Sequence, residues 1–467
     1  MSDTGAVADR GASTPDIGVG DLAVAESAVR DSARDMASPD RPSPPDAPVD
    51  MPAGRPDGSA MEASVADSAV ADGLADKPFL VDARDGGTWD APVADLVAAD
   101  SPREMAEDSG ADAKDSGDGG CDHDGADGCV PTAGVVWTRA TVSPTSYWSS
   151  VASSADGTRI FGGGTDNIYL SADSGATWTQ SLSTQQWIVV ASSADGTKLV
   201  AGGYDGTIYT SKDSGATWTR TLGSQGWSSV ASSADGTKLV AAGNGYIYTS
   251  KDSGATWTQT GAYLEWYSVA SSADGTKLVA AAYDDYIYTS KDSGATWTQT
   301  GTQQSWEAVA SSADGTKLVA TVYGSYIYTS KDSGATWTQT GTQQSWQAVA
   351  SSADGTKLVA TGAAVSGEAG YIYTSKDSGA TWKQTGNAQK WQAVASSADG
   401  VDLIAAVSDW KAGLGYIYTS GDSGATWTQQ PGSPSQCWGA VASSSDGTRL
   451  VAMGNPGYIY LSSGPVP

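Results

Sequence analysis

The sequence is poor in the residues that most catalytic and metal sites use. It has three cysteines and one histidine in 467 residues, and the histidine, His123, lies before residue 134. The region from residue 134 onward therefore has no histidine for a catalytic triad or for metal ligation. No apolar run reaches the roughly 20 residues that span a bilayer. Met1–Arg30 has no basic start followed by an apolar stretch, so no signal peptide is visible.

Basic side chains are also scarce, 26 against 53 acidic ones, and the imbalance is strongest at the N-terminus. Residues 1–133 hold 29 of the acidic and 9 of the basic side chains, and their only Phe, Tyr or Trp residues are Phe79 and Trp89. Such a segment cannot bury enough apolar surface to offset the entropy of ordering, so we expect a disordered acidic arm. Its charge repels phosphate, so we expect neither nucleic acid as a partner nor insertion into a membrane.

The composition of the arm resembles that of linkers that hold bacterial surface domains away from the envelope, so we expect an extracellular or cell-surface location. Cys121 and Cys129 bracket a short Asp/Gly segment of the arm. They would either close a small loop in an oxidising compartment or remain two unpaired thiols. Asp122, Asp124 and Asp127 between them lack the regular spacing and the late Glu of a calcium loop. We therefore expect no metal and no cofactor.

The rest of the chain, residues 134–467, consists of repeats. Eight units each open with a tryptophan, 39 to 47 residues apart: Trp148, Trp187, Trp227, Trp266, Trp306, Trp346, Trp391 and Trp438. In the fifth unit four segments are rich in Val, Ile, Thr, Tyr and Trp: 306–311, 317–321, 326–329 and 336–340. Asp314-Gly315 between the first two segments is a tight-turn signal. Four short antiparallel strands per unit predict an all-β propeller, and the absence of a 3.6-residue apolar period excludes a helical solenoid.

The segment between the third and fourth strands reads Ser-x-Asp-x-Gly-x-Thr-Trp, and we call it the box turn. It occurs seven times, with its Asp at Asp173, Asp213, Asp252, Asp292, Asp332, Asp377 and Asp422. The region resembles the Asp-box (BNR) propeller superfamily, which includes sialidases, β-glucan hydrolases, sorting-receptor ectodomains and photosystem II assembly factors. We interpret these aspartates as structural: the carboxylate accepts hydrogen bonds within the turn, and the Gly supplies the left-handed residue.

The last unit lacks a fourth strand, and the beginning of the folded region supplies a candidate for it. Val135–Arg139 aligns with Ala335–Gln339, and the 11 residues from Trp137 to Trp148 match the 11 from Trp427 to Trp438. We expect residues 135–141 to pair with residues 458–461, which would close the ring and remove two exposed edges. This arrangement predicts eight blades, with seven as the alternative.

Strand directions alternate in a four-stranded meander, so the connections fall on two faces. The constant face carries the repeated Asp-Gly turns and box turns, and the variable face carries the second-to-third connections and the links between units. Function tends to reside on loops that vary over a rigid scaffold. Exposed aromatics beside polar groups suit sugar rings or extended peptides. The candidate binding residues on the variable face are Tyr204, Asp205, Tyr263, Glu265, Tyr283, Asp284, Asp285, Tyr323, Asp409, Trp410 and Lys411.

Catalysis is less well supported than binding. None of the four arginines from residue 134 onward, Arg139, Arg159, Arg220 and Arg449, lies in a variable connection, so no sialidase-type triad can be assigned. A glycosidase needs two facing carboxylates. Acids outside the repeated turns are Asp166, Asp205, Glu265, Asp284, Asp285, Glu307, Glu368, Asp402 and Asp409. We therefore expect a non-catalytic, monomeric module that binds a glycan or a protein segment. A β-glucan hydrolase is the alternative, followed by a protein-assembly factor and a purely structural surface head.

Overall fold

The computed structural model describes residues 136–140, 146–183, 186–223, 225–363, 369–409, 412–463 and 466. The acidic arm with Cys121 and Cys129, and the candidates Trp410 and Lys411, lie outside these ranges. All the regular secondary structure in the described ranges is β-strand. Among these residues we find no helix with the length and apolarity that crossing a bilayer requires.

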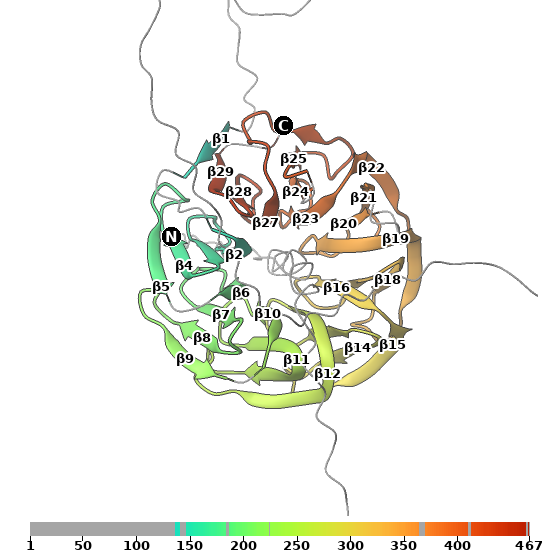
Figure 1. Cartoon of the computed structure of the whole chain (residues 1–467). Coiled ribbons are helices and arrows are strands. Elements are labelled where there is room, and N and C mark those ends of the chain that lie inside the picture. The colour runs from blue at the N-terminus through green and yellow to red at the C-terminus, as the bar shows by residue number, and fades with distance from the viewer. Residues whose placement is uncertain are drawn as a thin grey trace, which may run out of the picture. The chain divides into compact units, whose positions relative to one another are not determined.

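The strands form six antiparallel sheets arranged as a ring (Figure 1). Three four-stranded sheets follow chain order: β2 (Trp148–Ser153), β3 (Ile160–Gly164), β4 (Asn167–Ser171) and β5 (Thr179–Ser183); β6 (Trp187–Ser192), β7 (Leu199–Gly203), β8 (Ile208–Ser211) and β9 (Thr219–Leu222); β23 (Trp391–Ser396), β24 (Leu403–Val407), β25 (Ile417–Ser420) and β26 (Thr428–Gln429). The fourth consists of β27 (Trp438–Ser443), β28 (Arg449–Gly454), β29 (Ile459–Ser463) and β1 (Val136–Arg139).

Two larger sheets each contain two opening tryptophans. The six-stranded sheet consists of β10 (Trp227–Ser232), β11 (Leu239–Ser250), β12 (Thr258–Ser271), β13 (Leu278–Ala282), β14 (Asp285–Ser290) and β15 (Thr298–Gln304). The seven-stranded sheet consists of β16 (Trp306–Ser311), β17 (Leu318–Val322), β18 (Ser325–Ser330), β19 (Thr338–Ser351), β20 (Leu358–Ala363), β21 (Gly370–Ser375) and β22 (Lys383–Gln389).

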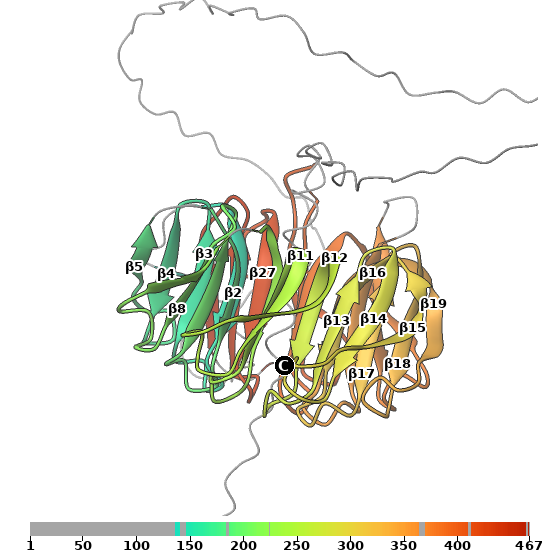
Figure 2. The same cartoon turned by 90° about the horizontal axis from the view of Figure 1, so that it is seen from below.

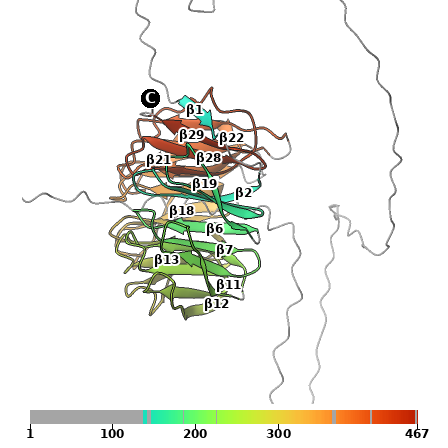
Figure 3. The same ribbon diagram turned by 90° about the vertical axis from the view of Figure 1, so that its left-hand side faces the viewer.

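The long strands of these sheets differ from the four short strands that each repeat predicts. β12 and β19 each run from the outer strand of one unit into the inner strand of the next, and β11 joins the second and third strands of the third unit. In β11 and β12 the connecting segments pair with each other: Asn244 pairs with Glu265, and Gly245 pairs with Leu264. These connecting segments are therefore part of the sheet. Seen from the side, the strands run from one face of the ring to the other (Figures 2 and 3).

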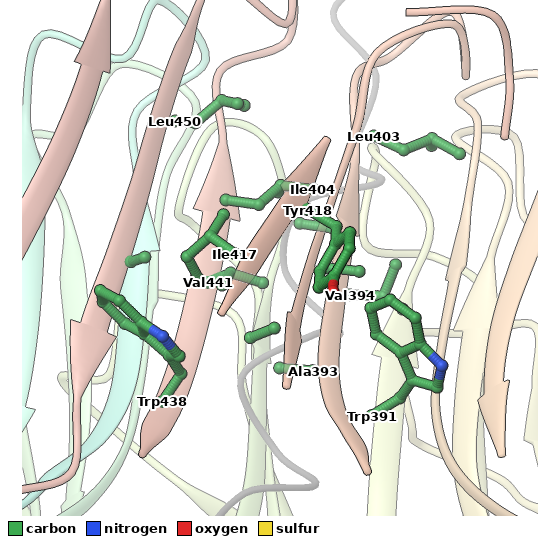
Figure 4. Close-up of a cluster of buried hydrophobic side chains, with 14 of the residues drawn as sticks. Trp391, Ala393, Val394, Leu403, Ile404, Ile417, Tyr418, Trp438, Val441 and Leu450 are labelled. Carbon is green, nitrogen blue, oxygen red and sulfur yellow. The ribbon is translucent and has the colours of Figure 1, made fainter. Parts of the chain in front are cut away.

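The opening tryptophans build the core. Each is at most 2% exposed, and each packs edge-on against a tyrosine of the third strand of its own unit, with ring centroids 5.1 to 5.7 Å apart. Burying a side chain of this size is worth about 2–3 kcal/mol. The apolar clusters lie between neighbouring units: in Figure 4, Ile404 and Ile417 of the seventh unit face Val441 and Leu450 of the eighth. Neighbouring units therefore share one core.

Two sets of contacts close the ring. The predicted pairing of the N-terminal segment with the last unit is confirmed, because β1 pairs with β29 in the register Thr138–Leu461 and Arg139–Tyr460. On the constant face, the Asp-Gly turn of each unit donates a backbone hydrogen bond to the turn of the next, as from Ala155 to Ala194 (2.8 Å). The turn of the last unit returns to the first, from Ser445 N–H to the Ala155 carbonyl at 2.7 Å.

Candidate functional site

The acids of the box turns are occupied within the turns. The Asp332 carboxylate accepts hydrogen bonds from the backbone N–H (2.9 Å) and hydroxyl (2.6 Å) of Thr336 and from the Ser330 hydroxyl (2.8 Å). The same set recurs at the other six aspartates: Asp173, Asp213, Asp252, Asp292, Asp377 and Asp422. The hydrogen bonds from the threonine hold the pKa of Asp292 and of Asp377 at about 2.

The box turn has two left-handed residues, whereas the sequence predicts one, the glycine. Ser333 has a φ of 59° and Gly334 a φ of 80°. Two consecutive left-handed residues direct the Gly334 N–H to the Ser330 hydroxyl oxygen, 2.8 Å away. That bond offsets part of the cost of a positive φ at a residue with a Cβ.

Most cations of the constant face hold neighbouring units together. The Lys277 ammonium donates to the Asp314 carbonyl of the next unit at 2.8 Å. Equivalent bonds come from Arg159, Lys198, Lys238, Lys317, Lys357 and Arg449. In the seventh unit the equivalent residue is Asp402, which lies in a repeated turn and not outside one as expected. Burial, and then Asp399 and Asp446, raises the pKa of Asp402.

The variable face is different in character. The exposed large hydrophobic side chains of the described residues all lie on it: Tyr147, Tyr204, Tyr263, Tyr323 and Leu414, with exposed fractions of 56, 57, 68, 42 and 50%. They occupy second-to-third connections and links that precede the opening tryptophans. The variable face is therefore the candidate binding surface among the described residues.

Eight of the candidate residues form a continuous set across the second to fifth units, which we call the tyrosine row: Tyr204, Asp205, Tyr263, Glu265, Tyr283, Asp284, Asp285 and Tyr323. The contacts that join them begin in β12. The Tyr263 ring meets Tyr246 edge-on, with centroids 5.1 Å apart. Two residues further on, the Glu265 carbonyl accepts a hydrogen bond from the Tyr283 N–H at 2.8 Å. Tyr283 itself is half-buried, because its ring stacks on Tyr267 with centroids 4.8 Å apart.

The row continues from Tyr283 to the fifth unit through Asp284 and Ser305. Asp284 has a φ of 51°, and its carboxylate accepts a hydrogen bond from the Ser305 hydroxyl. The Gln303 amide donates to the Asp284 carbonyl at 2.7 Å. The Ser305 carbonyl in turn accepts a hydrogen bond from the Tyr323 N–H at 2.9 Å. The backbone spacing between Tyr283 and Tyr323 is therefore fixed by hydrogen bonds.

Gln225 connects the row to the second unit. Its amide donates to the Tyr246 carbonyl (2.6 Å), and its side-chain oxygen accepts from the Tyr246 N–H (2.9 Å). The connection that carries Tyr204 and Asp205 packs on the same residue, since a Cβ at Gly206 would come within 2.9 Å of the Gln225 carbonyl oxygen. Two exposed residues, Tyr204 and Asp205, thus extend the row by one unit.

The acids of the row are held to different degrees. The Asp285 carboxylate accepts hydrogen bonds from the Tyr286 N–H (2.8 Å) and the Tyr288 hydroxyl (3.2 Å). Burial, together with Asp285, raises the pKa of Tyr288 to about 12, so Tyr288 remains a donor at neutral pH. Asp205 accepts hydrogen bonds from the N–H and hydroxyl of Thr207. Glu265, Asp284 and Asp205 are exposed, and each lies within two residues of a tyrosine of the row in the sequence.

The ninth described candidate, Asp409, is not part of the row. It lies in the seventh unit, separated from the row by the sixth, and forms an ion pair with Lys390 at 2.8 Å. Its carbonyl accepts a hydrogen bond from the Cys437 thiol (3.6 Å), whose pKa is raised by burial. Its neighbours Trp410 and Lys411 lie outside the described residues.

Several residues that support the row were not identified from the sequence. Tyr246 belongs to a position that is tyrosine in most units, so it is not distinctive. Tyr267 and Glu307 share the second position of the inner strand, which also holds Ser149, Ile188, Ser228, Gln347, Gln392 and Gly439. That variability inside an otherwise constant strand is the signal that could have identified Tyr267. Glu307 is 4% exposed.

Nothing in the described ranges resembles a metal site or a sialidase-type arginine triad. We find there no group of three His, Cys, Asp or Glu residues that could hold a metal ion. Arg159 and Arg449 donate to carbonyls of the constant face, and Arg220 lies in the outer strand β9. Arg139, in β1, lies over the Tyr458 ring, 4.2 Å from its centroid.

No protein-family model matches the chain, and no curated protein matches its sequence. Solved structures do match its fold. The C-terminal WD40 domain of Sif2 is 14% identical, with 71% of this chain and 99% of that one covered and a TM-score of 0.56. The computationally designed protein Ika8 is 14% identical, with 69% and 98% covered and a TM-score of 0.54. YCF48 from Cyanidioschyzon merolae is 17% identical, with 70% and 98% covered and a TM-score of 0.48. At these identities the likeness concerns the fold, and the first two matches support the conclusion that the described part of this chain is a β-propeller.

Proposed function

We propose that this chain is a non-catalytic binding module that holds an extended protein segment or a glycan on its variable face, along the tyrosine row. The observation that supports this most strongly is that the exposed large hydrophobic side chains of the described residues all lie on that face. Tyrosine rings offer large contact areas at a small entropic cost, and the backbone hydrogen bonds of the row hold them in fixed positions.

The test is a glycan and peptide array with the full chain, followed by a reducing-sugar assay on any glycan hit. Combining Tyr204→Ala, Tyr263→Ala and Tyr323→Ala should weaken binding tenfold or more, about 1.4 kcal/mol, because exposed aromatic anchors dominate such interfaces. Folding should be nearly unaffected, since surface changes usually stay within about 0.5 kcal/mol each. Lys291→Ala and Lys331→Ala on the constant face are the matched controls. Loss of binding in the lysine variants alone would refute the proposal, and sugar release would establish the hydrolase alternative.

We also propose that the propeller has eight blades and that the chain is related to the Asp-box propellers. Three observations support the count: eight tryptophans that each open an inner strand, the two opening tryptophans in each larger sheet, and a cycle of turn hydrogen bonds that includes Ala155, Ala194, Ala234, Ala273, Ala313, Ala353, Ala398 and Ser445. The seven box turns support the relationship.

We further propose that residues 1–133 act as an acidic spacer that displays a monomeric propeller at a bacterial cell surface. The support is compositional: self-repelling charged linkers extend. Protease treatment of intact cells tests the location, since a displayed propeller would be released and an internal one would not.

A further inference from the structure

The tyrosine row is long and open, which restricts the shape of its ligand. It passes through four consecutive units, from Tyr204 in the second to Tyr323 in the fifth, and three of its tyrosines are 42 to 68% exposed. A surface of this form contacts an extended chain at successive points along its length. This inference rests on the proposed function of the row and concerns the chemistry of its ligand.

Charge is distributed unequally between the two faces. Glu265, Asp284 and Asp205 are exposed acids of the row. Of the described lysines and arginines, Lys390 is the one in a variable-face connection, and it is paired with Asp409. The others lie in the turns of the constant face or in outer strands: Arg139, Arg159, Lys198, Lys212, Arg220, Lys238, Lys251, Lys277, Lys291, Lys317, Lys331, Lys357, Lys376, Lys383 and Arg449. The row therefore presents rings and negative charge with no unpaired described cation in its connections.

Tyrosine rings together with exposed carboxylates favour a positively charged ligand. A lysine or arginine side chain gains from a tyrosine face and from a neighbouring carboxylate at the same time. An acidic ligand would be repelled, and this excludes the chain's own arm, which has 29 acidic and 9 basic side chains. We propose that the tyrosine row binds an extended, lysine- and arginine-rich protein segment, with basic side chains over Tyr263 and Tyr323 and beside Glu265 and Asp284.

The test is fluorescence anisotropy with the full chain and three labelled probes: a peptide of about 12 alternating lysine and serine residues, its glutamate counterpart, and a neutral β-glucan oligosaccharide. An extended peptide of that length spans about 40 Å, enough to contact several units. The key variant combines Glu265→Gln with Asp284→Asn, which removes two charges with little change of shape. Asn tolerates the positive φ at position 284. The matched control is Asp166→Asn, an exposed acid in the first unit on the same face but outside the row.

We expect the lysine peptide to bind and the glutamate peptide not to bind. The double variant should weaken binding about threefold to tenfold at about 50 mM salt, with a smaller effect at about 300 mM because exposed charges are screened. Tyr263→Ala should weaken binding of the lysine peptide at both salt concentrations, and Asp166→Asn should leave its affinity unchanged. Equal affinities for wild type, double variant and control would overturn the inference, because binding would then reflect only the overall negative charge. If the oligosaccharide or the glutamate peptide binds instead, and Tyr263→Ala abolishes that binding, the inference fails while the proposed function stands.

Discussion

Asp402 shows how much one residue can depart from its repeat. At the equivalent position other units have a lysine or arginine that donates to a carbonyl of the next turn, as Lys357 does to Asp399 at 2.7 Å. Asp402 instead lies between Asp399 and Asp446, and its pKa is raised by burial and by those two acids. The seventh and eighth units therefore lack one of the bonds that join other neighbours.

We predict that Asp402→Lys stabilises the propeller at neutral pH. The new ammonium should reach the Asp446 carbonyl and replace a repulsive charge, which is worth roughly 1 kcal/mol. For a domain of this size that corresponds to an increase of about 2 °C in melting temperature. Differential scanning calorimetry would measure it, with Lys357→Asp as the reciprocal change that should lower the melting temperature. A decrease with Asp402→Lys would show that the position requires an acid.

The turn aspartates predict how stability depends on pH. The pKa values of Asp252, Asp292 and Asp314 are lowered to about 2 in the folded chain, from 3.8. Groups with depressed folded pKa values add stability that is present above the unfolded pKa and is lost as the pH falls through the folded one. The melting temperature should therefore fall steadily between about pH 4 and pH 2. Asp402 acts in the opposite direction, since its raised pKa favours the folded state at low pH. A melting temperature that is constant down to pH 2 would contradict the role assigned to the turn acids.

At the scale of elements, β1 is the strand on which closure depends. It covers β29, which otherwise would be an open sheet edge. Deleting residues 134–142 should lower the melting temperature or cause aggregation, whereas deleting residues 1–130 should leave the melting temperature unchanged. Thermal unfolding with light scattering would follow both. If deleting residues 134–142 changes neither the melting temperature nor the light scattering, the ring does not need β1.

The sequence predicts the elements well where a repeat specifies them. Segments rich in Val, Ile, Thr, Tyr and Trp predict the strands, Asp-Gly pairs predict the turns, and the alignment of residues 135–139 with residues 335–339 predicts the closure. The long strands β11, β12 and β19 were not predicted, because they depend on pairing between links, as between Asn244 and Glu265. A second left-handed residue at Ser333 was missed for a similar reason: a hydrogen bond to Ser330 decides it, and Ser is not a residue that signals a positive φ.

At the scale of the whole molecule, the repeat indicates which face varies, but it cannot indicate which variable residues meet. Tyr283 lies 20 residues after Tyr263, and Tyr323 lies 40 residues after Tyr283. Backbone hydrogen bonds to the carbonyls of Glu265 and Ser305 connect the segments that carry them. Asp409 has a similar local sequence environment, yet it pairs with Lys390 in another part of the ring. Partners that lie 18 or more residues away in the sequence decide these outcomes, and spacing alone does not reveal them.

Metal dependence is a second property of the whole molecule. The turn acids are saturated with hydrogen bonds from Ser and Thr, so a chelator should find no stabilising ion to remove from the propeller. We predict that EDTA leaves the melting temperature unchanged, with added calcium as the control. A loss of several degrees with EDTA would mean that an ion stabilises the fold.

The central claim is that ligands bind along the tyrosine row. Hydroxyl-radical footprinting of the full chain, with and without a bound ligand from the array, tests this most directly. Tyr204, Tyr263 and Tyr323 are exposed and should be oxidised readily in the free protein. We predict that the ligand protects Tyr263 and Tyr323 while the oxidation of Tyr147, exposed on the same face but outside the row, stays unchanged. Unchanged oxidation at Tyr263 and Tyr323 in a saturated complex would contradict the account.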